Sequence, residues 1–217
     1  DLTPLAGLTK LEDLNLSNNS SSTGNTITDL GPLATCTSLR TLNYWGNNCL
    51  SDITPLANLR NLEYLELGQG RVVDITPISG LDKLTYLSLH NNRVRDCAPL
   101  AGLKNLDYLC LDGNQIQDHS PLAALTRLTS FSAFGSGISD ISWLANLTAL
   151  QHLSLFDNQI QDLSPLANCG QLRNVQLQNN RIASVQGLVR NAELGSPAEV
   201  YLTNNPLSQE ALCSEIP

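Results

Sequence analysis

The chain has 217 residues, of which 15% are charged and 41% are apolar, and its formal net charge is −8. This acidic balance argues against a nucleic-acid-binding surface, which requires clustered Lys and Arg. No apolar stretch approaches the ~18 residues of a membrane-spanning helix, so we do not expect membrane insertion. The apolar content is sufficient for a packed core.

A repeat of about 22 residues dominates the sequence. Eight units cover residues 1–180, and a ninth, irregular unit ends at Asn205. Each unit opens on an aspartate, and from the third residue after it the unit reads P-L-A-x-L-x-x-L-x-x-L-x-L-x-x-N, with Trp143 as the one replacement of the proline. The aspartates that open the units are Asp1, Asp29, Asp52, Asp74, Asp96, Asp118, Asp140 and Asp162.

The core L-x-x-L-x-L-x-x-N is the signature of leucine-rich repeats. A 22-residue unit that carries D-I-x-P-L-A resembles the bacterial internalin type and the related phosphatase-regulator type. The resemblance implies an α/β solenoid, a curved right-handed superhelix with a parallel β-sheet on its concave face and short 3₁₀ or extended turns on its convex face. It also implies recognition of a partner protein on the concave face.

The division of the chain follows from the repeats. Residues 1–205 are predicted to form the solenoid, with about nine repeats and an inserted polar loop at 20–25 in the first. Residues 206–217 are interpreted as the start of a truncated C-terminal cap, since solenoids need polar caps over their terminal repeats. The loop is also an alternative recognition element.

Period-two alternation predicts one short strand per unit, with leucines facing inward and the residues between them facing outward. An asparagine column turns the chain after each strand and satisfies backbone groups between repeats. Gly70 and Ser136 interrupt this column, so looser turns are expected there. Phe131 and Ala133 replace two leucines of the sixth unit and indicate a repacked core.

Cysteine and histidine positions give little sign of chemistry. Three cysteines replace core residues, and no pair of cysteines is expected to form a disulfide. His119 is interpreted as a buried histidine with one backbone partner. His90, Asp112 and Cys110 share the outward face and are a weak zinc candidate, because the usual ligand spacing is missing. The core cysteines are Cys36, Cys97 and Cys169.

No catalytic signature occurs, so an enzyme is not expected, and neither a cofactor nor a bound metal is predicted. The strongest functional pattern lies in the outward positions of the strands, which hold seven of the ten aromatic residues and no Lys or Arg. The predicted partner-binding residues are Trp45, Tyr64, Glu66, Tyr86, His90, Tyr108, Asp112, Phe134, His152 and Phe156.

This band predicts a non-catalytic module that binds a partner protein, because Tyr and Trp are enriched at binding hot spots. Glu66 and Asp112 favour a basic partner. The alternatives are a carbohydrate-binding module, a scaffold domain of a larger multidomain protein, self-association, or simple cross-strand stabilisation of the sheet. Trp143 is interpreted as a packing residue. A bacterial cell surface or secretion is favoured over the cytoplasm.

Overall fold

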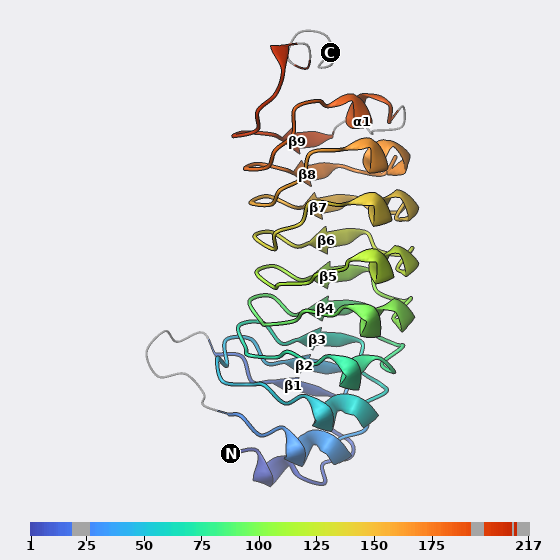
Figure 1. The fold of residues 1–217 in the computed structure, drawn as a ribbon. Coiled ribbons are helices and arrows are strands. Elements are labelled where there is room, and N and C mark those ends of the chain that lie inside the picture. Colours follow the sequence, from blue (N-terminus) through green and yellow to red (C-terminus); the bar gives the residue numbers. More distant parts are fainter. Residues whose placement is uncertain (19–26, 192–197, 210, 212–217) are drawn as a thin grey trace.

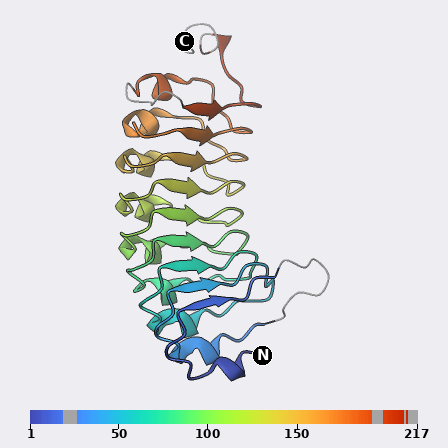
Figure 2. The same ribbon diagram turned by 180° about the vertical axis from the view of Figure 1, so that it is seen from behind.

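The computed structural model describes residues 1–18, 27–191, 198–209 and 211 (Figure 1). Within these described ranges, nine strands form one parallel sheet whose spatial order is the order of the chain. Figure 2 shows the strands stacked along the solenoid from the other side. The strands are β1 (Asp13–Asn15), β2 (Thr41–Asn43), β3 (Tyr64–Glu66), β4 (Tyr86–Ser88), β5 (Tyr108–Cys110), β6 (Ser130–Ser132), β7 (His152–Ser154), β8 (Asn174–Gln176) and β9 (Glu199–Tyr201). The predicted solenoid is confirmed.

Each strand pairs with the next without a shift in register. Tyr64 lies opposite Tyr86, and Tyr86 lies opposite Tyr108, so equivalent positions of successive units form straight columns. The middle residue of each strand points into the core, and Leu65 and Leu87 are fully buried. The register therefore places every inward leucine in one continuous core and every outward residue in one surface.

Short helical turns return the chain on the side away from the sheet. Each 3₁₀ turn begins two residues after a unit aspartate, whose Oδ1 accepts the backbone N–H of the first turn residue, as between Asp74 and Thr76 at 2.8 Å. The final helix instead follows Ser184, whose Oγ accepts the N–H of Gln186 at 3.2 Å. The turns are η1 (Thr3–Leu5), η2 (Gly31–Thr35), η3 (Thr54–Asn58), η4 (Thr76–Ile78), η5 (Ala98–Gly102), η6 (Ser120–Ala124), η7 (Ser142–Asn146), η8 (Ser164–Asn168) and the α-helix α1 (Gln186–Val189).

The aspartate contact explains why each unit opens on this residue. The carboxylate satisfies an N–H that has no partner inside the turn, as a helix cap does. These bonds hold the pKa of Asp52, Asp74, Asp118 and Asp162 below its ordinary value, with the Ser or Thr that follows as the main cause. The charged form is therefore the one that supports the fold.

The asparagine column bonds the backbone as predicted. Asn92 is buried, and its Nδ2 donates to Leu89 O at 3.0 Å and to Leu67 O at 2.9 Å. Its Oδ1 accepts the N–H of Val72 at 3.0 Å. One side chain thus ties its own turn to the turn of the preceding unit, which satisfies polar groups that water does not reach. Asn19, another member of the column, lies outside the described residues.

The two interruptions of this column are accommodated differently. Ser136 donates to Phe134 O at 3.2 Å, and its own N–H bonds Asn158 Oδ1 at 3.2 Å. Gly70 makes room for its neighbour, because a Cβ there would lie 2.7 Å from Asn92 Oδ1. The predicted looseness of these turns stays a prediction. The loop at 20–25 lies outside the described residues, as does most of the predicted cap.

The sixth unit is repacked around aromatic side chains. Phe131 and Ala133 are buried, and the Trp143 indole meets the Phe131 ring edge to face, with centroids 5.1 Å apart. The interpretation of Trp143 as a packing residue is confirmed. The buried Cys36, Cys97 and Cys169 also hold the core positions expected of them. Burial raises the pKa of Cys169 to about 11, so its thiol stays protonated.

Candidate partner-binding face

The outer sheet face consists of the residues that point away from the leucine core on and just after the strands. Its first feature is a ladder of three tyrosines, one on each of β3, β4 and β5. The rings of Tyr64 and Tyr86 stack with centroids 4.2 Å apart, and those of Tyr86 and Tyr108 with centroids 4.3 Å apart. The unshifted parallel register brings these rings together, as the sequence predicted. All three side chains are half-buried.

The hydroxyls of Tyr86 and Tyr108 are donors at neutral pH. Burial is the main reason that the pKa of Tyr108 is raised to about 12 and that the pKa of Tyr86 lies well above its usual range. The hydroxyl of Tyr86 donates to Glu66 Oε2 at 3.4 Å. The ladder therefore offers ring edges and polar hydroxyls on the same strip of surface.

The two predicted acidic residues are built into the sheet. Glu66 and Asp112 are 7% and 8% exposed. Glu66 Oε1 accepts the N–H of Gly68 at 2.8 Å. Asp112 Oδ1 accepts the N–H of Phe134 at 2.9 Å and the hydroxyl of Ser132 at 2.5 Å. Both carboxylates are largely engaged by groups of the chain itself, so they offer a basic partner less than their sequence positions suggest.

Asp112 also affects the protonation of the neighbouring Cys110 thiol. Cys110 donates to Asp112 Oδ2 at 3.0 Å and is 5% exposed. Burial, together with the negative charge of Asp112, raises the pKa of Cys110 to about 12. The thiol is therefore protonated at neutral pH and is not a nucleophile.

Trp45 of the second unit and His90 of the fourth unit meet across the third unit, and we call this contact the Trp45–His90 clasp. The indole Nε1 of Trp45 donates to His90 Nε2 at 3.1 Å, although one whole repeat separates them. Gly68 occupies the position between them, and a Cβ there would lie only 1.9 Å from His90 Cε1. The other ring nitrogen, Nδ1, lies 3.0 Å from Ser88 Oγ and 3.6 Å from Glu66 Oε1.

A pair of phenylalanines continues the aromatic surface beyond β5. The rings of Phe134 and Phe156 stack with centroids 4.5 Å apart, and both are half-buried. They follow strands β6 and β7, whereas the tyrosine ladder lies on β3 to β5. His152, the first residue of β7, is exposed.

The predicted site residues therefore divide into groups. The tyrosine ladder, the Phe134–Phe156 pair and the Trp45–His90 clasp present side chains to solvent, while Glu66 and Asp112 support them from within the sheet. His90 turns toward Trp45 and Glu66, and Cys110 and Asp112 bond each other. No group of three His, Cys, Asp or Glu side chains suited to a metal ion occurs among the described residues.

Sequence reasoning missed two contributions to this face. Gly68 is the residue that lets the clasp close, and its only signal is the lack of a side chain in an outward column. Ser132 bonds Asp112 and so joins the face of β6 to that of β5. Neither contact follows from residue type, because each depends on how far a side chain reaches across the sheet.

Comparison with known proteins agrees with this architecture. A family model described as Leucine Rich repeats (2 copies) matches residues 37–83, 82–124, 126–168 and 148–190. The chain is 36% identical to an internalin (inlF) from Listeria monocytogenes, and the two structures superpose with a TM-score of 0.88. The match covers 97% of this chain and 59% of the internalin. It is 33% identical to internalin C2 from the same organism, with a TM-score of 0.76, over 89% of this chain and 80% of that one. The chain belongs to the leucine-rich repeat proteins of the internalin type.

A more distant structure shares the fold of this internalin-type chain. The ectodomain of the Arabidopsis thaliana receptor kinase GASSHO1/SCHENGEN3, solved in complex with CASPARIAN STRIP INTEGRITY FACTOR 2, is 24% identical with a TM-score of 0.75. The match covers 93% of this chain and 25% of the receptor ectodomain. No curated protein matches the chain. Among the described residues, no helix is long and apolar enough to cross a membrane.

The leucine-rich repeat fold is typically a non-catalytic module that binds proteins or peptides.

Proposed function

We propose that this domain is a protein-recognition module whose partner docks on the outer sheet face. The contact surface consists of the tyrosine ladder, the Phe134–Phe156 pair and the Trp45–His90 clasp. The observation that carries the proposal is the gathering of these rings on one face, where five of them stack at centroid distances of 4.2 to 4.5 Å. Stacking holds the rings in one orientation, so little side-chain entropy remains to be lost on binding.

Stabilisation of the sheet does not by itself account for the aromatic residues. The leucines on the opposite side of the strands already complete the core, and Leu65, Leu87 and Leu109 are fully buried. A cross-strand pair contributes only about 0.2–1 kcal/mol, and smaller side chains serve that purpose in the other units. Half-exposed Tyr and Trp side chains are the residues that dominate binding energy at protein interfaces.

The geometry favours a protein partner over a glycan. Sugars stack on open ring faces, but both faces of Tyr86 are covered by Tyr64 and Tyr108. Phe134 and Phe156 likewise cover one face of each other. The edges of the rings and the tyrosine hydroxyls are what a partner meets, and these suit apolar side chains and backbone carbonyls. Because Glu66 and Asp112 are buried, a basic partner is not required.

The test is a comparative capture experiment followed by measurement with the purified partner. Three baits are compared: the parent domain, a tyrosine variant and a control variant. The tyrosine variant carries Tyr64→Ala/Tyr86→Ala/Tyr108→Ala. The control carries Asn61→Ala/Asn105→Ala/Arg127→Ala, at exposed positions that precede the strands. Circular dichroism first verifies that all three are folded. We expect one protein to be retained by the parent and the control but lost from the tyrosine variant. Equal retention by all three proteins contradicts the proposal.

A further inference from the structure

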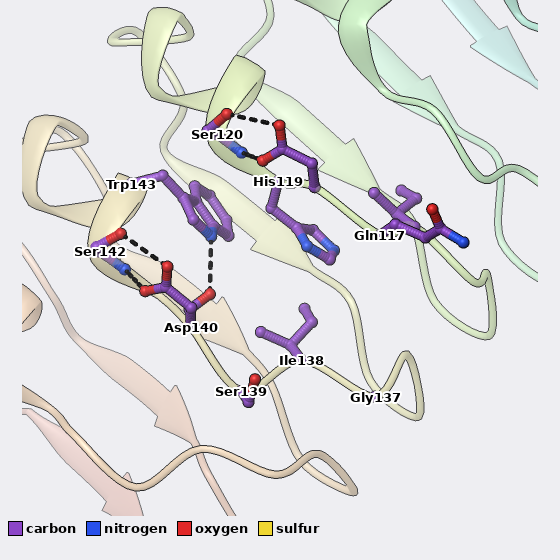
Figure 3. A pocket seen from close by; sticks show the side chains of 11 residues that line it. Gln117, His119, Ser120, Gly137, Ile138, Ser139, Asp140, Ser142 and Trp143 are labelled. Atoms are coloured by element: carbon purple, nitrogen blue, oxygen red, sulfur yellow. Dashed lines mark hydrogen bonds between the residues drawn. The ribbon is translucent and has the colours of Figure 1, made fainter.

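A small hollow lies on the flank of the solenoid, where the fifth and sixth units lead into turns η6 and η7. Figure 3 shows the side chains that line it. Its volume is about 140 Å³, which exceeds the space needed for a single water and is below that of sites for drug-sized ligands. A hollow of this size suits one side chain or a small organic group.

Several departures from the repeat meet in this one place. His119 stands where the flanking units have Cys97 and Ile141, and Trp143 stands where they have proline. Gly137 and Ser139 stand where the preceding unit has Gln115 and Gln117 and the following unit has Gln159 and Gln161. The short residues open the hollow, and the His119 and Trp143 rings line it side by side with centroids 5.9 Å apart.

His119 has a polar atom without a partner at this place. The residue is 8% exposed, and no described group bonds its Nε2, so the backbone partner predicted from the sequence is not found at that nitrogen. A buried ring nitrogen that lacks a hydrogen bond is unfavourable. Burial also lowers the pKa of His119, so the ring is neutral at pH 7 and one of its nitrogens is an acceptor.

Three other polar side chains of the hollow, those of Ser120, Ser142 and Trp143, already use their donors within the chain. Ser120 Oγ donates to Asp118 Oδ2 at 2.9 Å, and Ser142 Oγ donates to Asp140 Oδ2 at 3.1 Å. Trp143 Nε1 donates to Asp140 O at 3.3 Å. Each carboxylate oxygen keeps free lone pairs, and no Lys or Arg is among the lining residues. The hollow therefore offers negative charge and acceptors to a ligand that carries donors.

We propose that this hollow binds a guanidinium group, supplied by an arginine side chain of a partner or by a small free guanidine. A guanidinium has five N–H donors, no acceptor and a planar shape that fits between carboxylates and aromatic rings. Its donors complement Asp118, Asp140 and His119. The site is independent of the outer sheet face, since none of the proposed partner-binding residues lines it.

The first measurement follows the two tryptophan indole N–H signals by ¹H–¹⁵N NMR while methylguanidinium chloride is added. Trp143 reports on the hollow, Trp45 is the internal reference on the sheet face, and Trp45→Phe assigns the two signals. We expect a saturable shift of the Trp143 signal alone. N-methylurea, a neutral molecule of the same shape, is expected to produce no such shift. Equal shifts with both compounds, or none with methylguanidinium, overturn the proposal.

Variants test the geometry of the hollow. Ser139→Gln restores the long side chain of both flanking units, and we expect it to abolish the shift. Asp118→Asn/Asp140→Asn keeps the Oδ1 that caps each turn but removes both charges, so binding is expected to weaken roughly fivefold or more. The matched control is Asp52→Asn/Asp74→Asn, at the same capping positions outside the hollow. Unchanged binding in both test variants overturns the proposal.

A final comparison identifies the source of the group. The tripeptide acetyl-Gly-Arg-Gly-amide is titrated beside methylguanidinium. Tighter binding of the peptide supports a partner's arginine, and tighter binding of methylguanidinium supports a free guanidine. Each result keeps the assignment of a guanidinium site, and the absence of binding by both compounds rejects it.

Discussion

The fifth and sixth units have the same backbone path but hold it by different side chains. In the fifth unit Asn114 donates to Leu89 O and Leu111 O at 2.9 and 3.0 Å and accepts the N–H of Val94 at 3.0 Å. In the sixth unit the single hydroxyl of Ser136 replaces these contacts, and it lies 3.2 Å from Phe134 O and 3.5 Å from Leu111 O. The same backbone path is therefore compatible with either an asparagine or a serine at this position.

The same unit also departs from the pattern in its core. Phe131 replaces a leucine, Ala133 replaces another, and the Trp143 indole packs against Phe131. Phe131 in β6 and Trp143 in η7 are 12 residues apart in the sequence, and they meet because the chain turns back behind the sheet between them. Departures that look independent in the sequence are therefore one packing solution in the structure.

The largest expected effect is the difference in stability between substitutions of Asn114 and of Ser136. Asn114→Ala removes the hydrogen bonds of the side chain and leaves the N–H of Val94 without a partner, while Leu89 O keeps Asn92 Nδ2 and Leu111 O keeps the Asn114 N–H, so we expect a loss of about 3 kcal/mol in the free energy of unfolding. Ser136→Ala removes a single strong contact and is expected to cost about 1 kcal/mol or less. Urea unfolding followed by circular dichroism measures both. Equal losses would show that the sixth unit relies on Ser136 as fully as the fifth relies on Asn114.

The aromatic packing of the sixth unit is the next most sensitive feature. Trp143→Pro restores the residue of the other units, yet it empties the space beside Phe131, so we expect a loss of about 2–3 kcal/mol. Phe131→Leu is expected to cost about 1 kcal/mol by itself. A double-mutant cycle in urea should give non-additive losses, because the two side chains touch. Additive losses would mean that the two replacements are independent.

On the sheet face, we expect a single added methyl group at Gly68 to break the Trp45–His90 hydrogen bond. Gly68→Ala places a Cβ where the His90 ring lies, so the ring must move and the bond from Trp45 is lost. We expect a change in Trp45 fluorescence and a loss of about 1 kcal/mol in stability. Gly102→Ala is the matched control, because a Cβ there meets only Ser79 O at 3.5 Å. A similar fluorescence change in the control would remove the special role of Gly68.

The smallest expected effect concerns acid sensitivity. Burial lowers the pKa of His119 in the folded chain, so below pH 6.5 the unfolded chain binds a proton that the folded chain does not. Stability from this residue is present above pH 6.5 and is lost as the pH falls toward the lower, folded pKa. His119→Ile should therefore lose less stability than the parent between pH 7 and pH 5, in urea unfolding at each pH. The exposed His152→Gln should behave like the parent.

That window is distinct from the one set by the unit aspartates. The pKa values of Asp52, Asp74, Asp118 and Asp162 are lowered in the folded chain, so their contribution is present above pH 3.8 and is lost below it. Unfolding measured between pH 4 and pH 2 should therefore show losses in the parent and in His119→Ile alike. A variant that differed from the parent only in that lower range would contradict the assignment of the upper window to His119.

Much of the fold was predictable because its signals are local and repeated. The leucine pattern recurs in eight units, so the spacing of the repeat was enough to predict the core, the strand order and the column of Tyr64, Tyr86 and Tyr108. The turn aspartates were recognised as a pattern, but their role as caps was not. The burial of Glu66 and Asp112 was also missed, because Glu66 bonds the N–H of Gly68 in its own unit and Asp112 bonds Ser132 and the N–H of Phe134 in the next.

The sequence by itself determined the period, the register and the side of the sheet on which each residue lies, since a regular repeat translates spacing directly into columns. Only the tertiary structure decided which outward residues remain open to a partner, how Trp45 reaches His90, and that His119, Gly137 and Trp143 surround one hollow. The physical reason is that these contacts depend on the volume and hydrogen bonds of side chains from neighbouring units, and neither quantity is written in the spacing of the repeat.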